Sequence, residues 1–238
     1  MMNILSKMKD LSPLEKKLSI RFNNNKLLTQ ALVHKSYINE NPHFPLDHNE
    51  RLEFLGDAVL ELAVTEYLFK RYPRTPEGEM TNWRASLVNA TMLGTMANEF
   101  DLYEHLFLSK GERKDQNQKA RQYILANAFE ALIGAIYIDQ GMDTAREFVE
   151  RNIISKLPDI LKNQSYLDAK TRFQETAQEK AGVTPTYKVL NEKGPDHEKH
   201  FTIGVYLGEE CVANGNGFSK QEAQMDAAAK ALQVKGWE

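Results

Sequence analysis

The spacing of apolar and polar positions changes near residue 168. Before that point, apolar side chains recur every three or four residues, which predicts a mostly helical region over residues 1–160. Its strongest segments are residues 50–72 and an almost wholly apolar run over 123–138, which Gly141 is expected to end. The polar residues 111–120 are expected to form a loop before that run.

The C-terminal part has a different pattern. The predicted elements are a helix at 168–181, strands at 186–190, 201–207 and 210–215, and a helix at 220–234 capped by Ser219. The chain is therefore predicted to contain an all-α domain over residues 1–160, a linker over 161–167, and an α+β domain of order α-β-β-β-α over 168–238.

The helix predicted at 50–72 carries a row of acids on one face. Glu50, Glu53, Asp57 and Glu61 are spaced at i, i+3, i+7 and i+11, and no Lys or Arg lies three or four residues from any of them. Such a row could be an ordinary solvated face. It could also bind a hard divalent cation, because Mg²⁺ prefers carboxylate and water oxygens.

A second acidic position lies in the apolar run 123–138. Its strongly polar side chains are Asn127 and Glu130, at i and i+3. A carboxylate on a largely buried helix rarely lies fully buried without a partner. Glu130 could face solvent through a narrow window, or it could face Glu53 and Asp57 across a metal ion.

Four segments together resemble blocks of the ribonuclease III family of double-stranded-RNA endonucleases. They are Leu-Val-His-Lys-Ser at 32–36, Asn-Glu-Arg-Leu-Glu-Phe-Leu-Gly-Asp-Ala-Val-Leu at 49–60, the block between Glu77 and Val88, and Ile-Leu-Ala-Asn-Ala-Phe-Glu-Ala-Leu-Ile-Gly at 124–134. Their order and spacing match the family, and the C-terminal pattern resembles its double-stranded-RNA-binding domain. The resemblance covers nearly the whole chain and is more specific than any single short motif.

The resemblance implies a metal-dependent active site. The implied metal ligands are Glu53, Asp57, Asn127 and Glu130, and the implied catalytic residues are Asp57, Glu130, Glu50 and Glu77. The expected cofactor is Mg²⁺, with Mn²⁺ as a substitute, and the implied products carry 5′-phosphate and 3′-hydroxyl ends. The implied roles are ribosomal RNA and mRNA processing. Glu77 has an alternative explanation, since acids are favoured in the first turn of a helix.

Asn127 departs from the family, which has Asp at that position. An amide oxygen can still bind Mg²⁺, but one negative charge is missing, so weaker metal binding is expected. Three interpretations remain open: a working enzyme with reduced activity or a higher metal requirement, an engineered change that holds RNA uncleaved, or a natural binder that no longer cuts.

In the C-terminal domain the resemblance implies three RNA contacts. Gln174 and Gln178 match minor-groove positions of the first helix, His197 lies in the loop expected to enter the next minor groove, and Lys220 opens the last helix near phosphates. Gln221 and Glu222 stand where the family often has more Lys or Arg, so fewer basic side chains are expected to contact phosphate.

Composition adds few constraints. The net charge is −3, which argues mildly against a nucleic-acid binder, so RNA contacts must come from local patches. The single cysteine, Cys211, favours a reducing cytoplasm. No apolar run reaches membrane-spanning length, no signal peptide is recognisable, and no Gly-rich loop indicates a nucleotide cofactor.

The expected partners are double-stranded RNA and a second copy of the chain, with Phe54 as a candidate for insertion into the partner of a homodimer. The alternative function is a non-cleaving regulator that binds double-stranded RNA on the same fold. A helical metal-storage bundle fits less well, because the Glu-x-x-His pairs of such bundles are missing.

Overall fold

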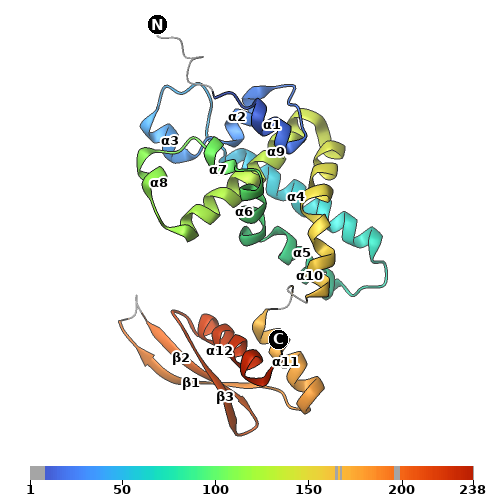
Figure 1. The fold of residues 1–238 in the computed structure, drawn as a ribbon, viewed down its shortest axis with the longest axis vertical. Helices are drawn as coiled ribbons and strands as arrows, with labels where there is room; N and C mark the ends of the chain where they lie inside the picture. Colours follow the sequence, from blue (N-terminus) through green and yellow to red (C-terminus); the bar gives the residue numbers. More distant parts are fainter. Residues whose placement is uncertain (1–8, 164–165, 167, 196–198, 238) are drawn as a thin grey trace. The chain divides into compact units, whose positions relative to one another are not determined.

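The chain divides into two compact units in the computed structural model, Met1–Asn163 and Gln164–Glu238. The structure describes residues 9–163, 166, 168–195 and 199–237. The first unit is helical and the second combines helices with a sheet (Figure 1), so the predicted fold classes are confirmed. Within the described residues, no helix is both long enough and apolar enough to cross a bilayer.

The helices of the first unit follow the predicted pattern, with additions. They are α1 Ser12–Leu18, α2 Asn25–Ala31, α3 Lys35–Glu40, α4 Glu50–Arg71, α5 Glu77–Val88, α6 Ala90–Glu99, α7 Leu102–His105, α8 Lys110–Lys114, α9 Gln118–Asn152, the 3₁₀ turn η2 Ile154–Lys156 and α10 Leu157–Lys162. The expected loop at 111–120 is partly helical, because Ser109 caps α8 by accepting a hydrogen bond from the backbone of Glu112.

Helix α9 provides the centre of the helical core. Its residues from Leu125 to Ile136 are mostly buried, as the apolar run predicts. Gly141 interrupts the helix with φ +84°, a conformation that L side chains rarely adopt. The predicted end at Gly141 is therefore a kink, after which a second helical half runs on to Asn152 in a different direction (Figure 1).

Two glycines allow α4 and α9 to pack with their backbones in contact. A Cβ atom on Gly56 would overlap the carbonyl oxygen of Glu130, and a Cβ atom on Gly134 would overlap the carbonyl oxygen of Leu52. Only a residue without a side chain fits at either position without a shift of the helix backbone. The glycine pair thus fixes how close α4 and α9 lie, and at which register.

The second unit consists of α11 Ala169–Ala181, β1 Thr186–Lys193, β2 His200–Leu207, β3 Glu210–Gly217 and α12 Lys220–Lys235. The strands form an antiparallel sheet of order β1-β2-β3, and both helices cover one face of it (Figure 1). Phe173, Val205, Ala227 and Ala231 are among the residues of its main core. Ser219 caps α12 as predicted, because its hydroxyl accepts a hydrogen bond from the backbone N–H of Glu222.

Candidate functional site

Three carboxylates from α4 and α9 form one electrostatic group, named here the carboxylate cluster: Glu53, Asp57 and Glu130. Burial raises the pKa of Glu130 to about 7, and the nearby charges of Asp57 and Glu53 add to the effect. Burial, with Glu50 and Asp57, also raises the pKa of Glu53. The acids of α4 therefore face Glu130 of α9. This arrangement is the one that a site across a metal ion requires.

The glycine contact explains why these acids meet. Gly56 directly precedes Asp57 and follows Glu53 by three residues, while Gly134 follows Glu130 by one helical turn. Bringing the two glycines into contact therefore brings the flanking acids of both helices to one place. The spacing of residues along the chain indicates no role for either glycine, because their contact becomes evident only when the two helices are known to cross there.

The two ends of the acidic row on α4 are neutralised by other helices. Lys35 of α3 lies 3.1 Å from a carboxylate oxygen of Glu50, and Arg84 of α5 lies 3.0 Å from Glu61. Glu50 and Glu61 are thus compensated, although no Lys or Arg lies three or four residues from them in the sequence. These partners are distant in sequence, so helical spacing could not reveal them. Within the part of the chain that the structure describes, Glu53 and Asp57 of this row form no ion pair.

Asn127 lies on α9 one turn before Glu130 and is half-buried. Its side-chain amide makes no hydrogen bond to another described residue. The amide oxygen is therefore available as a neutral ligand beside the carboxylate cluster. A metal ligand at residue 127 would have to lie in this place, although the neutral amide adds no negative charge.

The fit of a divalent cation rests on the chemistry of this set. No three Asp, Glu, His or Cys side chains among the described residues enclose a common point. However, the mutual repulsion that helps raise the pKa of both Glu53 and Glu130 is what a bound cation relieves. Carboxylate and amide oxygens are also the hard ligands that Mg²⁺ takes. The residues present therefore suit a hard divalent ion.

Glu77 lies apart from the carboxylate cluster of its own chain. It begins α5 and accepts a hydrogen bond from the Thr81 hydroxyl at 3.2 Å. It lines a groove of about 250 Å³ together with Leu68 and Phe69 near the C-terminal end of α4. Those residues lie about three helical turns beyond Asp57. Within one chain, the structure does not bring Glu77 to the other predicted acids.

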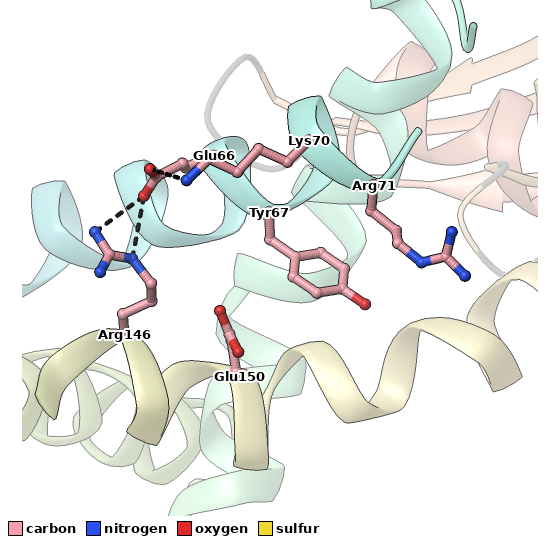
Figure 2. A pocket seen from close by; sticks show the side chains of 6 residues that line it. All are labelled: Glu66, Tyr67, Lys70, Arg71, Arg146 and Glu150. Atoms are coloured by element: carbon pink, nitrogen blue, oxygen red, sulfur yellow. Dashed lines mark hydrogen bonds and ion pairs between the residues drawn. The ribbon is translucent and has the colours of Figure 1, made fainter. Parts of the chain in front are cut away.

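A second group of charges joins the C-terminal half of α4 to the part of α9 after the kink. Figure 2 shows Glu66 between Lys70 and Arg146, with Arg146 Nε 3.1 Å from Glu66. Glu150 and Tyr67 also line this open pocket of about 210 Å³. Its acids and bases largely pair with one another near solvent, where each pair contributes little to stability.

The predicted RNA contacts of the second unit are placed as follows. Gln174 and Gln178 are exposed one turn apart on α11, and Lys220 is exposed at the start of α12. His197 lies outside the described residues. Glu222 supports the start of α12, because its carboxylate accepts a hydrogen bond at 2.8 Å from the backbone N–H of Phe218, the residue before the Ser219 cap. This use of Glu222 gives a physical reason for the acid at a position where the family often has a base.

Comparison with known proteins identifies both units. A Ribonuclease-III-like family model matches residues 24–157, and a double-stranded RNA binding motif matches residues 169–235. The chain is 44% identical over 227 residues to Ribonuclease 3 of a Nitratiruptor species, covering 95% of this chain and 97% of that protein. It is 41% identical over 226 residues to Ribonuclease 3 of Bacillus velezensis, covering 95% of this chain and 90% of that protein.

A crystal structure of the ribonuclease III nuclease domain from Campylobacter jejuni superposes with a TM-score of 0.55 at 38% identity, covering 63% of this chain and 98% of that one. The two units are those of an RNA-cleaving enzyme with an RNA-binding module. The chain belongs to the ribonuclease III family and is an endoribonuclease of that type.

Proposed function

We propose that this chain hydrolyses phosphodiesters of double-stranded RNA with Mg²⁺ or Mn²⁺, leaving 5′-phosphate and 3′-hydroxyl ends. The observation that carries the proposal is the carboxylate cluster, whose acids repel one another on two helices held in backbone contact. We further propose that the enzyme works in the cytoplasm on ribosomal and messenger RNA precursors. Family membership supports the substrate class, and the free thiol of Cys211 supports the compartment.

The proposed ligands are Glu53, Asp57, Glu130 and the amide oxygen of Asn127. When bound, the ion supplies a nucleophilic water at neutral pH and stabilises negative charge on the leaving oxygen. Glu50 borders this set and is held by Lys35, so its proposed role is to shape the site beside the scissile phosphate. We place Glu77 outside the site of its own chain, where its position in the first turn of α5 suits the helix dipole.

Asn127 favours the second candidate function, a regulator that binds double-stranded RNA without cleaving it. The test is a cleavage time course on a long RNA duplex over a Mg²⁺ titration, run on this chain and on Asn127→Asp. We expect both to cut. The Asp variant should reach half-maximal rate at a Mg²⁺ concentration lower by about tenfold or more, because the added charge attracts the ion.

The matched control is Asn98→Asp, which adds the same charge at an exposed position at the end of α6. It should leave the Mg²⁺ requirement unchanged. If only Asn127→Asp cuts, this chain is a cleavage-impaired form of the enzyme. If neither cuts while both bind the duplex, the non-cleaving regulator is the correct function.

We also propose that the functional unit is a homodimer built on α4. Phe54, Leu62 and Phe69 lie along one side of this helix with 82%, 57% and 72% of their surface exposed. Apolar side chains gathered in this way mark interaction surfaces. A structure of the related Campylobacter jejuni nuclease domain, 37% identical, is described as flexible in a region involved in dimer formation.

Truncation of the dimer contact tests this proposal. Phe54→Ala should weaken self-association by about 30-fold or more, as expected when an aromatic anchor is removed from an interface. Light scattering after size-exclusion chromatography should give about twice 27.2 kDa for the unchanged chain and a smaller mass for the variant at low micromolar concentration. Val234→Ala, an exposed apolar residue of α12, is the control. A monomeric unchanged chain would contradict the proposal.

A further inference from the structure

The C-terminal unit presents an aromatic pair to solvent at the start of α12. The ring of Phe218 is 67% exposed, and its centroid lies 4.2 Å from that of His200 at an interplanar angle of 51°. His200 begins β2, and Phe218 follows β3 directly. A single exposed apolar side chain is common and needs no explanation. This ring, however, is supported by a second ring and held by a fixed backbone.

The backbone at Phe218 is fixed from both sides. Its N–H donates to the Glu222 carboxylate at 2.8 Å, and Ser219 caps the same turn. Gly217 packs so closely on α12 that an added Cβ atom would lie 2.6 Å from the backbone nitrogen of Ala223. The ring of Phe218 is thus presented from a rigid base, which lowers the conformational entropy lost when a flat ligand stacks on it.

Two lysines border the segment that carries this pair. Lys220 lies two residues after Phe218, and its ammonium lies 5.7 Å from the ring centroid of the buried Phe201. Lys193 pairs with His200 across the β1–β2 ladder. The nearby carboxylate of Glu222 accepts the hydrogen bond from the backbone N–H of Phe218. An aromatic surface beside lysines suits a ligand that combines a flat ring with phosphate.

We propose that Phe218, supported by His200, is a stacking platform for an unpaired nucleobase of a structured RNA. The inference rests on the RNA-binding function proposed above and extends it to a preference for duplexes with a bulge or mismatch. In a regular A-form helix the major groove is too deep and narrow for side chains to read, and the bases are stacked on each other. An exposed aromatic ring gains a base contact only where a base has left the stack.

The experiment compares two RNAs with the full chain in EDTA, so that no cleavage occurs. One is a perfect duplex, and the other carries a single bulged 2-aminopurine. Phe218→Ala should weaken binding of the bulged RNA by about fivefold or more, the effect of losing one base–aromatic stack, and leave the perfect duplex nearly unchanged. The unchanged chain should quench 2-aminopurine fluorescence on binding, and the Ala variant should not.

Phe218→Tyr keeps the ring and should retain the preference, whereas Val234→Ala controls for loss of an exposed apolar group in the same domain. An equal loss on both RNAs, or no loss on either, would overturn the stacking role. Absence of duplex binding by the unchanged chain would instead overturn the RNA-binding function, and this inference with it.

Discussion

A single methyl group at Gly134 is expected to destabilise the nuclease domain by about 3 kcal/mol or more and to abolish cleavage. The added Cβ atom would overlap the carbonyl oxygen of Leu52, which is backbone and cannot rotate away as a flexible side chain can. Helices α4 and α9 would have to separate. That shift would also move Glu130 away from Glu53 and Asp57.

Thermal unfolding followed by circular dichroism measures the change. A loss of about 3 kcal/mol in the free energy of unfolding corresponds to a fall in melting temperature of roughly 10 °C for a domain of this length. Gly78→Ala is the matched control, since Gly78 lies in helix α5 and a Cβ atom there would meet nothing within 4 Å. This control should be neutral or slightly stabilising. Equal melting temperatures for Gly134→Ala and the control would refute the tight contact.

Glu130→Gln is expected to lower the rate of RNA cleavage on the order of 10³-fold, because removal of a charged metal ligand costs several kcal/mol of transition-state stabilisation. Binding of duplex RNA in EDTA should persist, since the C-terminal domain is untouched. Single-turnover cleavage with saturating protein separates the two effects. Glu150→Gln, an exposed acid on the second half of α9, is the control that should keep full activity.

The same variant should be more stable than the unchanged chain when no divalent ion is present. The pKa of Glu130 is raised to about 7 on folding, so the folded chain binds more protons than the unfolded chain between pH 4.5 and pH 7. The free energy of unfolding therefore falls as the pH rises through this range. Gln removes the charge, so the variant should gain on the order of 1 kcal/mol at pH 8 after allowance for partial solvent access.

This stability difference should largely disappear at pH 4.5, where the carboxyl is protonated in the folded chain. Adding Mg²⁺ at pH 8 should raise the melting temperature of the unchanged chain and not that of the variant. A variant that is less stable than the unchanged chain at pH 8 in EDTA would show that Glu130 is not held against its neighbours.

Local patterns in the sequence predicted most of the fold. The 3.6-residue spacing identified α4 and the buried half of α9, and Ser219 predicted the start of α12 because a cap acts within one turn. The helix α8 was missed because polar residues with a Gly give little periodicity, and its cap at Ser109 was the available signal. Gly141 marked a break in α9, but its effect on direction depends on the packing that follows.

The candidate site could be predicted only in part, because two of its determinants act between helices. The acids of α4 and α9 were identified by spacing and resemblance. The ion pairs that neutralise Glu50 and Glu61 come from Lys35 and Arg84, which no helical period connects to them. The rings of His200 and Phe218 meet through the register of β2 and β3, which the strand pattern did not fix.

The glycine contact between α4 and α9 makes the geometry of the site independent of its charge. The positions of the proposed ligands are set by the backbone contact of Gly56 and Gly134, which tolerates no added volume, whereas the chemistry of each proposed ligand is set by its own side chain. Exchange of Asp for Asn at residue 127 alters charge while conserving shape, so it can arise and revert by one substitution without compensation elsewhere. Under the ligand role proposed for Asn127, metal affinity is thus an independently adjustable trait, whereas the helix crossing is not.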